Sequence, residues 1–227
     1  MSETIRLAVF DCDGTLVDSQ HAILDAMGQA FRAEGREAPD PHAVRRIIGL
    51  ELSHAMAQLL PEAEHQTHLD LAEAYRGVAY AQRQQGMHEE PLFEGAREVI
   101  ETLAAAGWML GVATGKSSRG LAEVLTGHGV DKYFSTLQTV DTASGKPAPG
   151  MLLQAMSETG AEPARTVMIG DTSYDMLMAG NAHASALGVS WGYHARDELR
   201  DAGAQLIIDD FGQMQKALET LLAGAAP

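Results

Sequence analysis

The chain of 227 residues has 45% hydrophobic residues, which is enough for one large domain or for one domain carrying an insert. Its net charge of −15 argues against nucleic acid and anionic membrane surfaces as partners, because both attract clustered Lys and Arg. Cys12 is the single cysteine, so no intrachain disulfide can form. We find no signal peptide and no apolar run of about 20 residues, and therefore expect a cytoplasmic protein.

The first predicted element is a buried strand over residues 5–10, which ends in the acidic sequence Asp11-Cys12-Asp13-Gly14-Thr15. Residues two apart in an extended chain point to the same face, so Asp11 and Asp13 can serve one site. Two close carboxylates repel each other unless a cation neutralises them, and Mg²⁺ prefers oxygen ligands. An acidic turn that only caps a helix is the alternative interpretation.

A helical region follows the acidic sequence, with Gly and Pro residues between its segments. Apolar residues recur at helical spacing over residues 21–34, 42–48, 51–60 and 62–85. Residues 19–85 contain no strand pattern. We therefore predict that residues 18–86 form an all-α cap inserted into a second, larger unit.

Strands and helices alternate from Pro91 onward. The predicted strands lie at residues 108–113, within 133–140, and at 166–169, 185–189 and 206–208, and helices fall between them. This alternation predicts an α/β fold, a doubly wound parallel sheet of Rossmann-like type with helices on both faces. We assign residues 1–17 and 87–227 to this core, whose sites are expected at the carboxyl ends of the strands.

Polar residues cluster at these predicted strand ends. They are Asp11 with Asp13, then Thr114, then Lys146 in a loop, and Asp171 with Asp175. Each has an ordinary explanation when taken alone: Thr114 ends a strand, Lys146 is a solvated loop lysine, and Asp171 caps a helix. These explanations weaken because all the clusters occur together at or near the predicted strand ends.

The combination resembles the haloacid dehalogenase superfamily with a small helical cap, in its phosphoglycolate phosphatase-like branch. Asp-Cys-Asp-Gly-Thr matches the first motif of that superfamily. Ala113-Thr114-Gly115 matches the second, Gly145-Lys146-Pro147 the third, and the segment from Gly170 to Asp175 the fourth. Cys12 departs from the pattern, since an apolar residue is more usual there.

The resemblance implies a role for each matching residue. Asp11 is expected to attack phosphorus and form an aspartyl-phosphate, and Asp13 to protonate the leaving oxygen and then activate water. Thr114, beside Gly115, is expected to hydrogen-bond a phosphoryl oxygen. Lys146 is expected to neutralise charge around the nucleophile.

The resemblance also implies a magnesium site. Its expected ligands are the Asp11 carboxylate, the backbone carbonyl of Asp13, and Asp171. Asp175 follows Asp171 by one helical turn. Either Asp175 orients Lys146 or it reaches the metal through water.

Cationic residues of the predicted cap are candidates for substrate recognition. Arg45 and Arg46 are positioned to meet a carboxylate or phosphate of the substrate, and a solvated face of a helix is the alternative. His21 lies beside the expected hinge between cap and core. Gly115-Lys116-Ser117 is similar to the end of a P-loop, but Leu110 stands where a P-loop requires glycine, so we reject an ATPase.

The leading hypothesis is a magnesium-dependent phosphatase for a small phosphorylated metabolite such as phosphoglycolate, acting as a monomer or homodimer. The first alternative is a phosphomutase of the β-phosphoglucomutase type, which shares the site but returns the phosphoryl group to a sugar. The second is a phospho-accepting receiver module, a binding module rather than an enzyme. A receiver places its aspartate later in the chain and has no helical insert.

Overall fold

The core of the molecule is a six-stranded parallel sheet, described by a computed structural model that covers residues 5–86 and 90–224. The strand order is β3-β2-β1-β4-β5-β6. The strands are β1 (Leu7–Phe10), β2 (Met109–Thr114), β3 (Phe134–Thr139), β4 (Thr166–Gly170), β5 (Ser185–Val189) and β6 (Leu206–Ile208). The chain runs outward from β1 in one direction through β3 and in the other from β4 to β6, so the sheet has a topological switch point at β1, where α/β proteins bind ligands.

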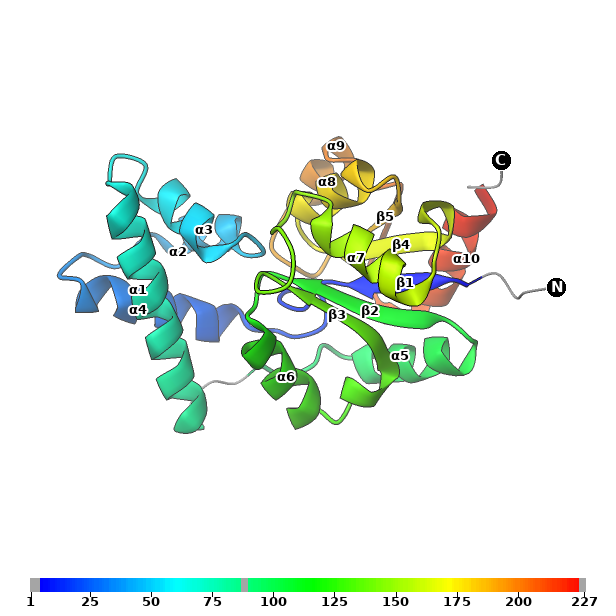
Figure 1. Ribbon diagram of the computed structural model, residues 1–227, viewed down its shortest axis with the longest axis horizontal. Coiled ribbons are helices and arrows are strands. Elements are labelled where there is room, and N and C mark those ends of the chain that lie inside the picture. The colour runs from blue at the N-terminus through cyan, green and yellow to red at the C-terminus, as the bar shows by residue number, and fades with distance from the viewer. Residues whose placement is uncertain (1–4, 87–89, 225–227) are drawn as a thin grey trace.

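The alternating side chains of the central strand explain why both faces of the sheet are covered. Ala8 and Phe10 join one apolar cluster, whereas Leu7 and Val9 join another on the opposite face. The first cluster includes residues of α5 (Ala96–Ala105), α6 (Ser118–Gly127) and α10 (Met214–Gly224). The second includes residues of α7 (Gly150–Thr159), α8 (Ser173–Asn181) and α9 (Arg196–Asp201). Figure 1 shows α5 and α6 on one side of the sheet and α7 and α8 on the other, which confirms the predicted doubly wound fold.

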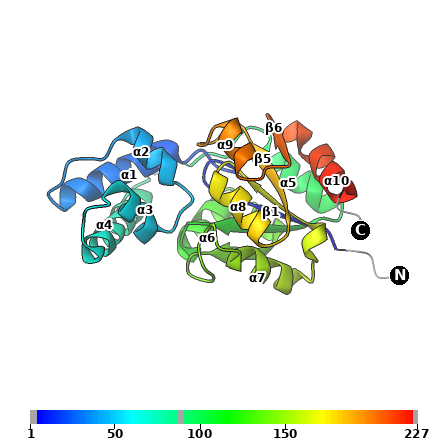
Figure 2. The same ribbon diagram turned by 90° about the horizontal axis from the view of Figure 1, so that it is seen from above.

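The helices that follow β1 form a separate layer at the carboxyl end of the sheet. They are α1 (Gln20–Ala33), α2 (Pro41–Ile47), α3 (Leu52–Leu59) and α4 (His65–Gln84). They lie together beside the core in Figures 1 and 2 and share an apolar cluster of their own. Within residues 18–86 the structure contains helices and no strand of the sheet. The residue boundaries that we assign to cap and core stay a prediction.

Most helices begin and end within one or two residues of the predicted positions. The main difference is α4, which begins at His65 because residues 61–64 form a turn after Pro61 rather than the first helical turn. The strand β1 begins at Leu7 rather than at residue 5. None of the helices within the described residues is long and apolar enough to cross a membrane.

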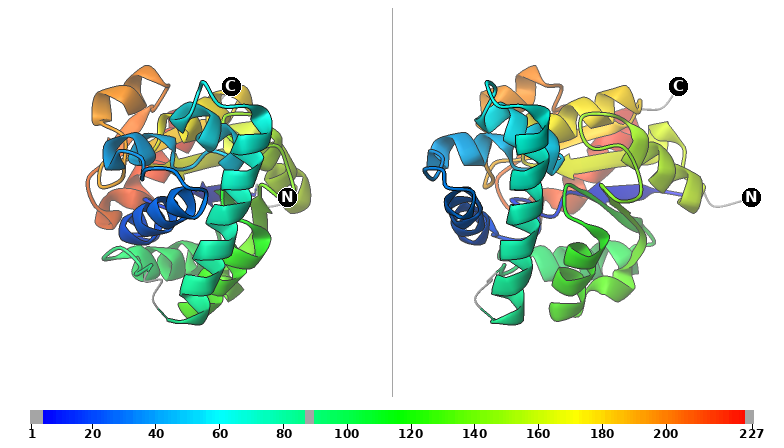
Figure 3. Two further views of the ribbon diagram at one scale, coloured as in Figure 1. Left: turned by 90° about the vertical axis from the view of Figure 1, so that its left-hand side faces the viewer. Right: turned by 60° about the vertical axis from the view of Figure 1, so that its left-hand side comes forward.

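Two chain segments that connect the helical layer to the core run side by side. The Asp18 amide donates to the Pro91 carbonyl at 2.8 Å, and the Phe93 amide donates to the Leu16 carbonyl at 3.0 Å. Val17 and Leu92 also form an antiparallel bridge. These contacts hold the helical layer over the strand ends, as Figure 3 shows from two directions.

Candidate active site

Carboxylates from two neighbouring strands meet at the switch point. Asp11 follows β1, and Asp171 follows β4, which is hydrogen-bonded to β1. Oxygen atoms of Asp11, Asp171 and Asp175 all lie within 4.8 Å of one another, and the three residues are fully buried. The parallel register of the sheet therefore assembles residues that are 160 positions apart in the chain.

Lys146 is the counterion of this cluster. Its Nζ lies 2.8 Å from Asp11 Oδ1 and 2.6 Å from Asp175 Oδ1, and its side chain has no exposed surface. Burial alone would lower the pKa of Lys146, but Asp11 and Asp175 raise it above its usual value, so the amine stays charged. Burial raises the pKa of Asp11, and the charge of Lys146 opposes that rise. Of the two roles considered for Asp175, the structure contains the direct contact with Lys146.

Asp171 is held rigidly by two hydrogen bonds. Thr15 donates its hydroxyl to Oδ1 at 2.8 Å, and the Tyr193 amide donates to Oδ2 at 2.9 Å. Burial and the charge of Asp175 nevertheless raise the pKa of Asp171 to about 7. Gly14 has a φ of +78°, and a Cβ there would stand 2.4 Å from Asp171 Oδ2. Glycine is therefore required in the first motif both for the turn and for the space beside this carboxylate.

The acidic cluster suits a hard divalent cation. Three carboxylates face one ammonium group, which leaves two negative charges in excess when all are ionised. Asp11 Oδ2 is buried and has no hydrogen-bond partner among the described residues. An oxygen atom in this situation is expected to have a ligand, because an unpaired buried carboxylate oxygen is costly. Asp11 and Asp171 of the predicted metal set lie in the cluster, which also includes Asp175.

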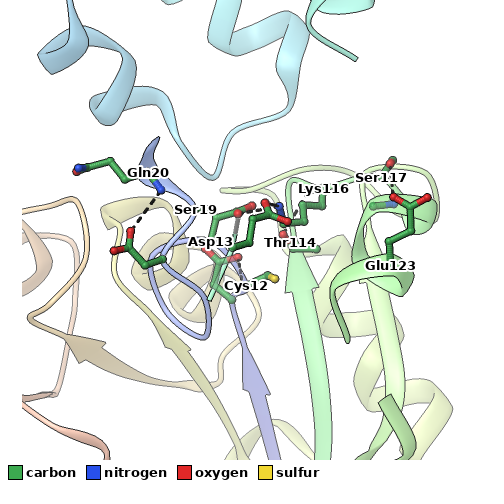
Figure 4. Close-up of polar contacts among 12 residues, drawn as sticks. Cys12, Asp13, Ser19, Gln20, Thr114, Lys116, Ser117 and Glu123 are labelled. Atoms are coloured by element: carbon green, nitrogen blue, oxygen red, sulfur yellow. Dashed lines mark hydrogen bonds and ion pairs between the residues drawn. The ribbon is translucent and has the colours of Figure 1, made fainter. Parts of the chain in front are cut away.

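Asp13 has surroundings that differ from those of Asp11. Its Oδ1 lies 2.9 Å from Lys116 Nζ, and Lys116 is also 2.5 Å from Glu90 Oε1. The three side chains are 11%, 8% and 5% exposed, so the ion pairs are shielded from solvent. Figure 4 shows Asp13 and Lys116 pointing toward each other beneath the helical layer. Asp13 is therefore paired with Lys116, whereas Asp11 is paired with Lys146.

Comparison with known proteins assigns the family. A family model described as haloacid dehalogenase-like hydrolase matches residues 8–189. The chain belongs to this family. It is 37% identical over 220 residues to "Probable phosphatase IndB" of Dickeya dadantii (strain 3937), covering 95% of this chain and 94% of that protein. It is also 29% identical over 235 residues to a phosphoglycolate phosphatase of Vibrio cholerae, covering 98% and 100%.

A solved structure supports the same assignment. A hydrolase from Pseudomonas syringae superposes with a TM-score of 0.83 at 27% identity, covering 96% of this chain and 99% of the other. The family and fold predicted from the motifs are thus confirmed. The chain is a hydrolase of the haloacid dehalogenase-like family, and its similarity to named phosphatases extends over nearly its whole length.

The second motif of this hydrolase lies where the helical layer meets the core. The Thr114 hydroxyl, at the end of β2, accepts a hydrogen bond from the Lys116 amide at 3.2 Å. A Cβ at Gly115 would be 2.9 Å from the carbonyl oxygen of Leu50 and 3.1 Å from that of Gly49. The loop between α2 and α3 therefore rests directly on the second motif.

Arg45 and Arg46 do not line the cavity of about 240 Å³ that lies between the helical layer and the core. Arg45 donates from Nε to Gln20 Oε1 at 2.8 Å. Arg46 forms an ion pair with Glu198 of α9. The carbonyl oxygen of Arg46 accepts a hydrogen bond from the Tyr174 hydroxyl at 3.0 Å. Arg46 therefore connects α2 to the core. His21 is exposed to solvent.

Lys116 and Glu90 are site residues that the sequence did not predict. In the sequence, Lys116 belongs only to an incomplete P-loop motif, and Glu90 belongs to no motif. A usable signal for Lys116 was its place two residues after Thr114, at the end of a strand adjacent to β1. Glu90 has no comparable signal, because only the return of the chain from α4 brings it to Lys116.

Proposed function

We propose that the hydrolase is a magnesium-dependent phosphatase that cleaves a small phosphomonoester through an aspartyl-phosphate on Asp11. The observation that carries this proposal is the pairing of Lys146 with one oxygen of the buried Asp11 carboxylate, while the other oxygen has no partner in the described chain. A nucleophile of this kind is oriented on one side and available on the other. The names of the relatives support the same reaction.

The chain's own residues account for both steps. Asp11 Oδ attacks phosphorus, and the bond from phosphorus to the alcohol oxygen breaks while Asp13 gives that oxygen a proton. Asp13 then removes a proton from a water molecule that attacks the aspartyl-phosphate, which releases inorganic phosphate and restores Asp11. Thr114 and Gly115 would donate hydrogen bonds to the phosphoryl oxygens. Lys146 holds Asp11 in place throughout and balances part of its charge.

Asp11, Asp171 and the carbonyl of Asp13 would hold Mg²⁺. The bound ion supplies positive charge where an anionic nucleophile meets an anionic phosphate. Asp175 would keep Lys146 oriented, through the ion pair at 2.6 Å. It also accepts hydrogen bonds from the Thr172 amide and hydroxyl at 3.0 and 2.6 Å, so its own position is fixed.

Release of inorganic phosphate from a panel of small phosphate esters tests the proposal. We expect many turnovers per enzyme molecule, loss of activity with EDTA, and recovery with added Mg²⁺. Asp11→Asn should abolish turnover and covalent labelling together. Full activity after removal of metal, or persistent labelling of Asp11→Asn, would contradict the proposed site.

The same assay separates the two alternatives. A phosphomutase would transfer the phosphoryl group to a sugar hydroxyl, so little inorganic phosphate would be released. A receiver module would incorporate at most about one phosphoryl group per chain and would not turn over.

A further inference from the structure

The cavity between the helical layer and the core is an opening in the apolar core of that layer. Its wall includes Met27 of α1, Ile48 and Leu50 of the α2–α3 loop, Ala55 of α3 and Tyr75 of α4. The side chains of Met27, Ile48, Leu50 and Ala55 are among the buried residues of the layer's own cluster. This part of the wall thus has the composition of a protein interior, although the cavity adjoins the candidate active site.

Residues of the catalytic site line the same cavity. Asp13, Gly115 and Lys116 contribute to its wall from the core side. If Asp13 protonates the leaving oxygen, the alcohol bonded to that oxygen extends from Asp13 into this space. The residues that line the cavity therefore indicate whether the alcohol part of the substrate is apolar, polar or charged.

The apolar part of the wall favours an apolar occupant. Its lining atoms lack dispersion contacts until something fills the space. A dry apolar cavity of about 150 Å³ is large enough to bind benzene, so the 240 Å³ here suits one substituted ring or a branched chain of similar size. A carboxylate placed against the apolar part of the wall would lose its hydration without gaining a partner there.

Most of the four cations on the cavity wall already have carboxylate partners, including Arg76, which lies 3.2 Å from Glu73 Oε2. Lys116 faces Asp13 at 2.9 Å. Arg119 Nε donates to Glu123 at 3.0 Å. Their positive charge is therefore largely balanced before any substrate binds.

Arg83 is less completely paired. Its nearest recorded carboxylate oxygen, on Glu123, is 3.9 Å away, and its Nε is buried without a hydrogen-bond partner in the described parts of the chain. The side chain lines the cavity. A hydrogen-bond acceptor on the leaving group would satisfy this donor at modest cost, and a neutral acceptor suffices because Glu123 already offsets part of the charge.

We propose that this cavity binds the alcohol part of the substrate, and that this part is an uncharged apolar or aromatic body rather than a short carboxylate such as glycolate. The inference rests on the proposed phosphatase function. It assigns recognition to the apolar wall around Met27, Leu50 and Ala55, with Arg83 as the polar group, in place of the outer arginines of α2.

The first experiment compares three esters with the same kind of leaving oxygen: ethyl phosphate, 2-phenylethyl phosphate and 2-phosphoglycolate. All three carry the phosphate on a primary alkyl carbon, so differences in kcat/KM arise mainly from binding of the alcohol part. We expect kcat/KM for 2-phenylethyl phosphate to exceed both other values by about tenfold or more. An equal or higher value for either short ester would overturn the inference.

A second experiment fills the cavity. Ala55→Phe should lower kcat/KM for 2-phenylethyl phosphate about tenfold or more, while ethyl phosphate changes by less than about twofold. Ala57→Phe is the matched control, since Ala57 is on the same helix, is only partly buried and does not line the cavity. If Ala55→Phe fails to fold, Leu52→Trp fills the same space from a less buried position. Equal losses on both esters in a folded variant would contradict the proposed specificity.

Binding of 2-phenylethanol, followed by calorimetry, separates this inference from the phosphatase proposal. If no ester is hydrolysed, the phosphatase proposal fails, while saturable binding that Ala55→Phe removes still supports the cavity as a site for an apolar body. Arg83→Met tests the opposite assignment. A preference for 2-phosphoglycolate that Arg83→Met abolishes would show that Arg83 recognises a carboxylate, and would overturn the inference.

Discussion

Asp11 and Asp13 lie two residues apart, yet their surroundings differ in the way that two separate catalytic roles require. Asp11 is fully buried and faces Lys146, in a cluster suited to a metal ion. Asp13 faces Lys116 on the wall of the cavity between the helical layer and the core. Replacement of the two residues should therefore have different kinetic consequences.

With Asp13→Asn, p-nitrophenyl phosphate should give a rapid initial release of nitrophenol followed by slow turnover. Nitrophenolate leaves without protonation, so phosphorylation of Asp11 should largely survive. Hydrolysis of the phosphoenzyme still needs a base and should slow by a factor of about 10² to 10⁴. We expect a burst of roughly one equivalent of nitrophenol, with a mass increase of one phosphoryl group on the peptide that contains Asp11. A phosphoenzyme mapped to another peptide would contradict these roles.

Lys116→Met should impair esters that need leaving-group protonation more than those that do not. Without Lys116 the Asp13 carboxylate loses the partner that fixes its position. The value of kcat/KM, which reports on transfer of the phosphoryl group to Asp11, should therefore fall about tenfold or more for an alkyl phosphate and less for p-nitrophenyl phosphate. The variant also removes the cation that faces the shielded Asp13 carboxylate, a loss of about 3–5 kcal/mol if that carboxylate does not relax toward solvent. Unfolding measurements on Lys116→Met should show this loss.

Two comparisons accompany the Lys116 variant. Lys116→Arg keeps the charge and should restore part of the activity on alkyl phosphates. The control is Lys216→Met, a surface lysine on α10, for which no change is expected on either ester. An equal loss of kcat/KM on both esters in Lys116→Met would mean that the lysine only stabilises the fold.

At the level of elements, the loop between α2 and α3 is the point where the helical layer contacts the motifs. Its Gly49 and Leu50 carbonyls lie over Gly115, and Glu51 Cβ would be 3.2 Å from a Cβ at Gly145. Both glycines belong to motifs, the second and the third respectively. The absence of side chains there lets the loop approach, so the layer closes over the site without displacing it.

Gly115→Ala should separate this loop from the site. The added methyl group would meet two backbone oxygens at 2.9 and 3.1 Å, and neither can rotate away as a side chain would. We expect kcat/KM to fall about tenfold, in keeping with the effect of small misplacements on catalysis. Gly127→Ala on α6, where nothing lies within 4 Å of the new Cβ, should leave kcat/KM unchanged. Wild-type activity in Gly115→Ala would show that contact between the loop and the second motif is not needed.

At the scale of the whole molecule, the buried carboxylates link folding stability to pH and metal. The pKa of Asp171 is raised to about 7 in the folded chain, compared with about 3.9 in an unfolded one. The folded protein therefore holds a proton that the unfolded chain releases between these values. Stability supplied by this protonated group is complete below about pH 4 and is lost as pH rises toward 7.

The melting temperature of the metal-free protein should consequently fall between pH 5.5 and 7.5. Added Mg²⁺ binds the ionised carboxylates, so it should raise the melting temperature more at pH 7.5 than at pH 5.5. Thermal unfolding with EDTA or with Mg²⁺ at both pH values measures this. Asp171→Asn should weaken both the pH dependence and the metal effect. An equal metal effect at the two pH values would argue against these carboxylates as the ligands.

The sequence by itself determined the elements, the layer order and the acidic centre of the site. Hydrophobic periodicity is local, so it reveals strands and helices without tertiary information. Parallel strands bring their carboxyl ends to one edge of the sheet, so motifs that follow strands, such as Asp11, Thr114 and Asp171, are predictable neighbours. The family resemblance added the roles of these residues.

Only the tertiary structure decided which cations pair with which carboxylates. It also decided how the helical layer forms the cavity beside the candidate active site. Lys116 joins Asp13 to Glu90, and Arg46 pairs with Glu198 across 152 positions of the chain. Such pairs depend on side-chain direction and on how a helical layer rests on the core, and neither leaves a periodic signal in the sequence. The cavity has the same origin: its apolar residues follow an ordinary core pattern, and only the placement of the layer over Asp13 brings part of that core next to the candidate active site.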